Sequence, residues 1–232
     1  MVLTTAQRRM LVIGLVPLLL LVLGGAAVTV SAIRGKLPYD YSAEFVPGER
    51  GVSVVSDVPV DVTSSPDGQV HVNVDGSYAA QQPAVNVTPT EGLLEVRTSC
   101  PDVHCSVDVV VELPTGVGVQ AKVEGTSLSV VGVSGPVKAA ASDGSIALMN
   151  LRSNRVSADC SRGSVAMVFD NPPSQVTATS TDGSLSVEVP HSVTYAVDAI
   201  AARGSTDLNI PNDPASARHL YLRSSNGSIT VN

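Results

Sequence analysis

Apolar and small residues alternate with polar ones along most of the chain after residue 36, in the step of two that is typical of half-buried β-strands. In the second half this alternation recurs around five Gly-Ser pairs. The positions seven, five and three residues before each glycine, and two and four residues after it, are apolar or small. The glycines are Gly144, Gly163, Gly183, Gly204 and Gly227. This pattern predicts strand, turn and strand in every copy.

The equivalent positions define a register for the copies. The slot seven residues before the glycine holds Val137, Val156, Val176, Val197 and Leu220, and Val119 begins a sixth copy without the glycine. A period of about 20 residues predicts a stacked array with neighbouring strands about 4.8 Å apart. We therefore expect an all-β fold, a right-handed parallel β-solenoid over 119–232. Stacking in chain order would leave Ile229–Val231 at an open sheet edge.

The turns themselves have a recurring chemistry. Turns such as Ser-Asp-Gly-Ser favour a residue that tolerates positive φ, and glycine does so without a Cβ clash. The residue before the glycine changes along the chain in the order Asp143, Arg162, Asp182, Arg203 and Asn226. Stacking in chain order would bring opposite charges together, and the alternating arginines argue against a calcium site.

The region 51–118 also predicts short strands, because valine-rich runs alternate with turn clusters there. The runs are Val52–Val55, Val58–Val62, Val70–Val74, Leu93–Arg97 and Val107–Leu113. This region is either a degenerate start of the same solenoid or a β-cap packed on it. Residues 34–50 are expected to be a juxtamembrane linker, with Tyr39, Tyr41 and Phe45 at the level of the lipid headgroups.

The N-terminus predicts a membrane anchor. Leu11–Ile33 contains no charge and would be about 34 Å long as a helix, enough to cross a bilayer. Arg8 and Arg9 favour a cytoplasmic location for the short tail 1–10, so the repeats would lie outside the cytoplasmic membrane. The alternative is a cleaved secretory signal and a secreted protein.

The charge of the exported part restricts its partners. Residues 37–232 contain ten Lys and Arg against 21 Asp and Glu, which leaves a formal charge of −11. This net charge argues against nucleic acid, an anionic lipid surface or an anionic wall polymer as a partner.

The three cysteines divide into two kinds. Cys100 and Cys105 are close in the sequence, and in an oxidising compartment they are expected to form a disulfide. A metal site with His104 is disfavoured because a fourth ligand is lacking. Cys160 stands three residues before a repeat glycine, where other copies have Ala or Ser, so we expect a buried, unreactive thiol.

The membrane segment, the paired cysteines followed by the strand Ser106–Pro114, and the Asp/Asn-Gly-Ser turns resemble a bacterial β-strand-repeat family of unknown function, usually labelled putative adhesins. The resemblance covers roughly residues 50–232. It implies a solenoid-like fold and a place in the cell envelope, and it supplies no catalytic residues.

No catalytic constellation is evident in the sequence. His71, His104, His191 and His219 are scattered over separate predicted turns and strand ends, without a nucleophile motif. Several outward positions are nevertheless small or apolar, which predicts a covering layer formed either by 51–118, the preferred interpretation, or by a partner protein. These positions are Ala140, Ala147, Met149, Ala166, Val168 and Ile200.

These observations predict a non-catalytic, envelope-anchored scaffold or interaction module without a cofactor or a metal. Its partner would be an envelope protein or a wall polymer. The alternative is an extracytoplasmic enzyme or a protein that binds a small ligand or polysaccharide.

Overall fold

The computed structural model describes residues 35–232. The predicted membrane segment Leu11–Ile33 lies outside these residues. The β-structure discussed below begins at Leu37, and Tyr39–Asn232 forms one compact unit. Within the described part of the chain, no helix has the length and apolar character needed to span a bilayer.

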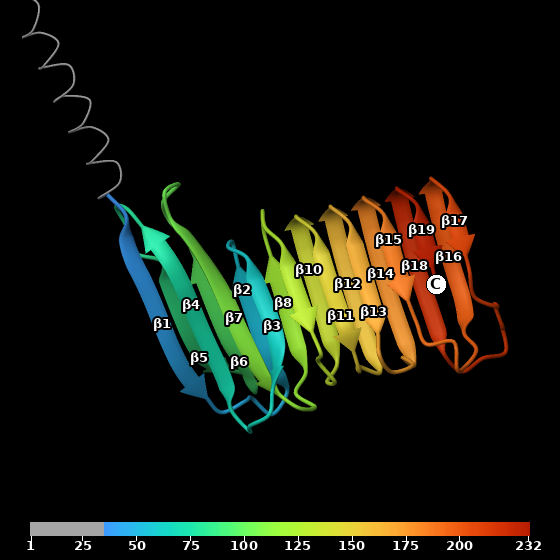
Figure 1. Cartoon of the computed structure of the whole chain (residues 1–232), viewed down its shortest axis with the longest axis horizontal. Coiled ribbons are helices and arrows are strands. Elements are labelled where there is room, and N and C mark those ends of the chain that lie inside the picture. Colours follow the sequence, from blue (N-terminus) through green and yellow to red (C-terminus); the bar gives the residue numbers. More distant parts are fainter. Residues whose placement is uncertain (1–34) are drawn as a thin grey trace, which may run out of the picture. The chain divides into compact units, whose positions relative to one another are not determined.

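The described residues form two sheets (Figure 1). Sheet A has ten strands in the order β1-β4-β7-β3-β9-β11-β13-β15-β19-β17, and sheet B has nine in the order β16-β18-β14-β12-β10-β8-β2-β6-β5. The strands are β1 (Leu37–Phe45), β2 (Gly51–Ser56), β3 (Val60–Ser65), β4 (Val70–Tyr78), β5 (Ala84–Thr90), β6 (Leu93–Ser99), β7 (Ser106–Pro114), β8 (Val119–Val123), β9 (Leu128–Val131), β10 (Val137–Asp143), β11 (Ile146–Leu151), β12 (Arg155–Arg162), β13 (Val165–Phe169), β14 (Gln175–Asp182), β15 (Leu185–Glu188), β16 (Ala196–Arg203), β17 (Thr206–Leu208), β18 (His219–Asn226) and β19 (Ile229–Val231).

Each repeat contributes one strand to each sheet, and the two strands meet at the Gly-Ser turn. We call such a pair a coil. Val137 pairs with Val119 on one side and with Val156 on the other, and all the pairings between repeat coils are parallel. Val176, Leu220 and Val197 continue the same row. The structure thus confirms the all-β fold and the parallel register predicted from the alternation.

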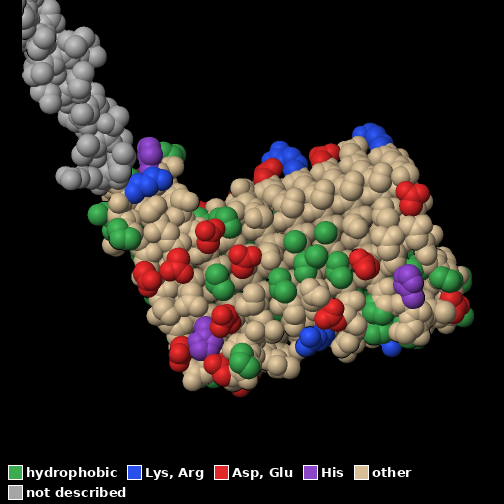
Figure 2. All heavy atoms as spheres, in the orientation of Figure 1, with side chains coloured by type: hydrophobic (Ala, Val, Ile, Leu, Met, Phe, Trp, Pro, Cys, Tyr) green, Lys and Arg blue, Asp and Glu red, His purple; other side chains and the backbone are tan. Residues whose placement is uncertain are grey.

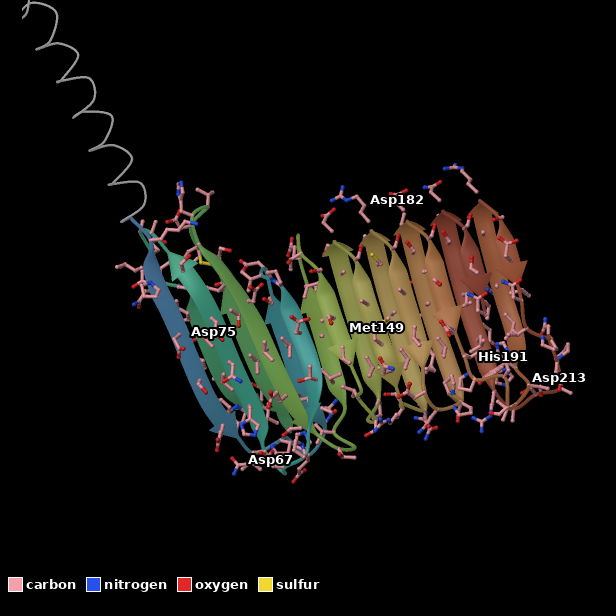
Figure 3. The ribbon with its side chains drawn as sticks, in the orientation of Figure 1. Asp67, Asp75, Met149, Asp182, His191 and Asp213 are labelled. Atoms are coloured by element: carbon pink, nitrogen blue, oxygen red, sulfur yellow. A yellow bond between two sulfur atoms is a disulfide. The ribbon has the colours of Figure 1, made fainter. Side chains whose placement is uncertain are left out.

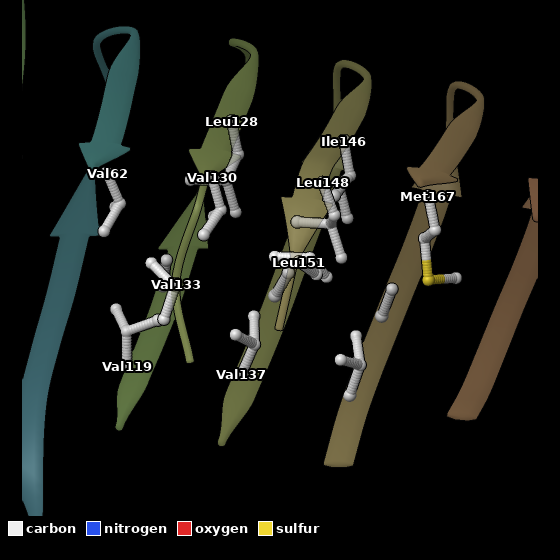
Figure 4. Packing of buried hydrophobic residues seen from close by; sticks show 14 of the residues in the cluster. Val62, Val119, Leu128, Val130, Val133, Val137, Ile146, Leu148, Leu151 and Met167 are labelled. Atoms are coloured by element: carbon white, nitrogen blue, oxygen red, sulfur yellow. The ribbon is translucent and has the colours of Figure 1, made fainter. Parts of the chain in front are cut away.

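The core lies between the two sheets. Leu128, Ile146 and Leu148 of sheet A lie in the same buried cluster as Val119 and Val137 of sheet B (Figure 4). Each of these side chains is at most 2% exposed. Burial of a Val or Leu side chain contributes about 1.5–3 kcal/mol, so the inward rows supply most of the stability of the array.

The coils do not stack in chain order. The final coil, β18/β19, lies between β14/β15 and β16/β17, so Ile229–Val231 is an internal strand and the predicted open edge there is wrong (Figure 1). Its core residues Leu220 and Leu222 are fully buried. The coil β16/β17 has smaller or more polar residues in these slots, such as Ala199 and Thr206, and this weaker coil occupies the edge.

The N-terminal half extends the same two sheets. The coil β2/β3 is also inserted, between β8/β9 and β6/β7. The coil β2/β3 pairs with β6 and β7 in parallel. Beyond β6 and β7 the pairing becomes antiparallel, because β5 pairs with β6 and β4 pairs with β7 in opposite directions. The partial copy of the repeat around Gly92 is therefore a hairpin, whose turn has positive φ at Glu91 and Gly92.

Residues 37–45, expected as a linker, form strand β1 at the edge of sheet A. Tyr39, Tyr41 and Phe45 pack against the core of the two sheets. Alternation of these aromatic residues with polar ones is the strand signal that the linker interpretation missed.

Candidate functional site

The repeat glycines form a column in which neighbouring backbones approach very closely. A Cβ atom on any of the five would lie 1.8–2.3 Å from a carbonyl oxygen of the adjacent coil. Four of them also have φ between 139° and 156°, but Gly183 does not, so the expectation of a positive φ there is wrong. At Gly183 the requirement for glycine comes from the approach of the Gly163 oxygen, at 1.9 Å from the Cβ position.

A row of small donors accompanies this column. Cys160, Ser180 and Ser224 occupy the slot three residues before the glycine, and each side chain donates to a glycine carbonyl. Ser224 Oγ, for example, lies 3.0 Å from the Gly183 oxygen. Burial raises the pKa of the Cys160 thiol, which keeps it protonated and unreactive. These residues satisfy buried polar groups at the turn, a role that the sequence register alone did not indicate.

The charged residues at the turns form a side-chain ladder in the spatial order Asp143, Arg162, Asp182, Asn226 and Arg203. Arg162 Nη2 lies 2.6 Å from Asp143 Oδ2, and Asn226 Nδ2 donates to Asp182 Oδ1 at 2.6 Å. The Arg162 guanidinium lowers the pKa of the Asp143 carboxyl. The expected order is corrected, because Asn226 separates Asp182 from Arg203.

The disulfide loop and the histidines lie apart from this ladder. Cys100 and Cys105 are joined, with their Cα atoms 5.7 Å apart. His104 in the loop is exposed and lies 3.4 Å from Asp102. His71 Nε2 on β4 lies 2.7 Å from Asp67 Oδ2, and this hydrogen bond raises the pKa of the His71 imidazole. Among residues 35–232 no three His, Cys, Asp or Glu side chains are grouped as a metal site would require.

The outer face of sheet A carries an apolar patch. It is formed by the outward residues of β9, β11 and β13 at the centre of the sheet (Figure 2): Val131, Ala147, Met149, Ala166 and Val168. Met149 is 37% exposed and the other four are partly exposed. The preferred prediction that 51–118 covers this face is wrong, since its strands extend the sheets sideways at their edges. No described residue forms a layer over the patch.

The two sheets differ in their positive charge. The ten strands of sheet A contain no Lys or Arg, and their carboxylates are Asp40, Glu44, Asp61, Asp75, Asp108, Glu112, Glu188 and Asp207. Asp75 lies to one side of Met149 in Figure 3, and Lys and Arg appear only at the margins of this face in Figure 2. The strands of sheet B contain all the strand cations, Arg97, Lys122, Lys138, Arg155, Arg162, Arg203 and Arg223, together with the carboxylates Glu95, Asp143, Asp159, Asp182 and Asp198. The net charge of the chain conceals this separation.

The fold defines an all-β repeat protein built of two facing, mainly parallel sheets. No protein-family model matches the chain, and no curated protein sequence matches it. Solved structures that are similar to it include a putative cell adhesion protein from Clostridium sporogenes, at 12% identity and a TM-score of 0.49, covering 84% of this chain and 99% of that chain. A putative adhesin from Bacteroides fragilis matches at 12% identity and a TM-score of 0.45, covering 84% and 97%. A putative adhesin from Parabacteroides merdae matches at 12% identity and a TM-score of 0.31, covering 83% and 96%. These solved structures are described as putative adhesins or as a putative cell adhesion protein. The sequence of the repeat turns resembles proteins of the same description.

Proposed function

We propose that this protein is a non-catalytic interaction module of the cell envelope, adhesin-like in role, which binds a partner protein through the apolar patch of sheet A. In this proposal the repeats wind as a right-handed β-solenoid, the segment 11–33 anchors the chain in the cytoplasmic membrane, and the sheets lie outside it.

The observation that supports this function is the uncovered apolar patch. Solvated faces of antiparallel or mixed sheets usually carry polar outward residues, whereas three neighbouring strands here carry Ala, Val and Met. Contiguous apolar surface on a soluble domain commonly marks a site of protein interaction. The five residues of the patch include no nucleophile or base, which suits docking better than chemistry.

The surroundings of the patch indicate the chemistry of the partner. Asp61 and Glu112 lie on the strands to one side of it, and Glu188 lies on the other side. A partner surface with an apolar centre and a rim of Lys or Arg would complement this arrangement.

Site-specific crosslinking in cells tests the proposal. A photoreactive amino acid replaces Met149 in the full-length chain, and a control chain carries it at Thr177 on the outer face of sheet B. We expect a discrete protein adduct from position 149, lost when Val168→Glu is added, and none from position 177. Equal adducts from both positions, or none from position 149, would overturn the proposal.

The topology is tested separately. Arg162 is exposed at a turn, with 69% of its side chain accessible. Arg162→Cys in the full-length chain should react with a membrane-impermeant thiol reagent in intact cells once any outer barrier is opened. Reaction that occurs only after lysis would place the sheets in the cytoplasm.

A further inference from the structure

The loop closed by the Cys100–Cys105 disulfide presents an apolar tip to solvent. Val103 in this loop is 94% exposed, more than any other large hydrophobic residue that the structure describes. Pro101 of the same loop and Ala80 of the connection between β4 and β5 are exposed as well. We call Ala80, Pro101 and Val103 the apolar tip.

The disulfide and the side chain of Asp102 restrain this loop. Asp102 Oδ2 accepts from the Ala80 N–H at 3.1 Å, and Asp102 Oδ1 accepts from the His104 N–H at 3.1 Å. The Asp102 carbonyl accepts a third hydrogen bond, from the Cys105 N–H at 2.9 Å. Because the loop is already ordered, docking of its tip costs little conformational entropy.

The charged groups around the apolar tip are few. Asp102 is the one carboxylate of the loop, its side chain is only 15% exposed, and the backbone N–H groups that donate to it lower its pKa. The His104 side chain is exposed and lies 3.4 Å from Asp102. Asp57 accepts a backbone hydrogen bond at the base of the loop. Asp75 and Asp108 face each other across β4 and β7, about 10 Å further along the strands. The tip itself is therefore an uncharged surface on an acidic chain.

The apolar tip lies where the chain enters the two sheets. The Tyr39 ring on β1 meets the Tyr78 ring on β4 edge to face, with the ring centroids 6.2 Å apart, and Tyr78 is two residues before Ala80. On the other side of β4, Ser77 pairs with Ser106, the first residue of β7 after the loop. Figure 1 shows the loop before β7 at the same end of the sheets as the start of β1.

The length of the chain before β1 limits how far this entry can lie from a bilayer. Six residues lead from Ile33, the end of the segment that the proposed function places in the membrane, to Tyr39. Fully extended, they span about 20 Å. Lipid is therefore the partner that the tether brings within reach of the apolar tip.

We propose that the apolar tip docks on the lipid bilayer that anchors the chain, with the Val103 side chain at the boundary between headgroups and acyl chains. A single valine binds lipid too weakly to hold a protein by itself, but the anchor keeps the bilayer at a high local concentration. The contact is apolar, so the acidic charge of the chain does not oppose it through the tip. The loop takes the place at the headgroup level that was expected for Tyr39, Tyr41 and Phe45, which pack on the core instead. This inference rests on the proposed function for the anchor at 11–33 and adds a second contact with the membrane.

Tryptophan fluorescence tests the docking, because the chain contains no Trp. Full-length Val103→Trp and Val46→Trp variants are reconstituted in phosphatidylcholine vesicles with and without bromine on the acyl chains. Val46 is the matched control, since it is 80% exposed and follows β1 at the end about 27 Å from the start of that strand. Bromine quenches on contact, so we expect it to reduce the emission of Val103→Trp about twofold or more and to leave that of Val46→Trp nearly unchanged.

A second reporter separates docking by Val103 from a contact that the new tryptophan creates. Ala80→Trp keeps Val103 in place and should also be quenched by bromine. Adding Val103→Asp should reduce this quenching to the level of Val46→Trp, because a carboxylate is costly to bury among acyl chains. Raising the salt concentration should change none of these results, since the contact is apolar. Thermal unfolding of each variant checks that the fold is intact.

Flotation of the same vesicles distinguishes failure of the docking from failure of the anchor. A chain that does not float with the vesicles would overturn both. A chain that floats while bromine quenches Val103→Trp no more than Val46→Trp would overturn the docking alone, as would quenching of Ala80→Trp that Val103→Asp leaves unchanged. The crosslinking experiment at Met149 does not involve the loop, so its outcome is independent of this one.

Discussion

The last two coils, β16/β17 and β18/β19, share one register but have opposite places in the molecule. The coil β18/β19 has neighbours on both sides, and Leu220, Leu222, Ile229 and Val231 are fully buried in it. The coil β16/β17 comes earlier in the chain yet lies at the edge, where Leu208 is 38% exposed. The difference shows that chain order does not fix the spatial order of the coils: the coil with the larger apolar residues lies inside, where their burial stabilises the array more.

Connections between coils permit this exchange. Residues 189–195 carry the chain past one position to β16, and residues 209–218 bring it back to β18. The returning segment also protects the exposed edge, since Asn212 donates to the Val197 carbonyl and accepts from its N–H. The side chain of Asn212 thus takes the place of a neighbouring strand for that residue.

The largest effect should come from truncating a leucine of the inner coil. Leu222→Ala is expected to lower the free energy of unfolding by about 2–4 kcal/mol, because it leaves a cavity among fully buried neighbours. Leu208→Ala in the edge coil makes the same chemical change and should cost about 1 kcal/mol or less. Urea unfolding followed by circular dichroism measures both, and equal costs would contradict the inserted order of the coils.

The repeat glycines should also differ in their sensitivity to substitution between an inner coil and the edge coil. Gly183→Ala places a Cβ 1.9 Å from a backbone oxygen between two coils, so the backbone must shift, at an expected cost of about 1–3 kcal/mol. Gly204→Ala should cost less than Gly183→Ala, because the edge coil can move outward. Gly68→Ala, with no atom within 4 Å of its Cβ position, is the control and should be nearly neutral. A Gly183→Ala as stable as Gly68→Ala would disprove the close approach.

Thiol reactivity tests the same difference between an inner coil and the edge coil, in proteins whose stability should differ little. Cys160 is 1% exposed in an inner coil, whereas Ala201 occupies the equivalent slot in the edge coil and is partly exposed. Native alkylation analysed by mass spectrometry should leave Cys160 unmodified and Cys100 linked to Cys105. In an Ala201→Cys variant the new thiol should react readily. Rapid alkylation of Cys160 would indicate that its strand has slipped by one residue.

The smallest effect is expected at the turn ladder. Asp182→Asn keeps an oxygen that can accept from Asn226, and the site is exposed, so stability should change by only a few tenths of a kcal/mol. We also expect no rise in melting temperature with millimolar calcium, because arginines interrupt the ladder. A rise of several degrees that Asp182→Asn abolishes would instead make these turns a cation site.

The alternation of residues in the repeats predicted their strands and their parallel register, because a parallel array repeats the same environment and Val156 and Val176 occupy equivalent buried positions. It did not predict that β18 pairs between β14 and β16. It did not predict the approach that excludes a side chain from Gly183, since that approach depends on the distance between two backbones. The candidate sites could be predicted from the sequence even less well than the fold. The apolar outward residues were visible, but their exposure depends on how β2 to β7 join the sheets.

The sequence by itself determined the strands, the inward rows and the parallel register, because side-chain alternation has a period of two wherever one face is buried. Only the tertiary structure decided which coil lies at the edge, since all coils share one register and differ in how much apolar surface they bury. It also decided that the strand Lys and Arg residues all lie on sheet B while sheet A has none, because strands distant in the chain become neighbours only when the sheets assemble.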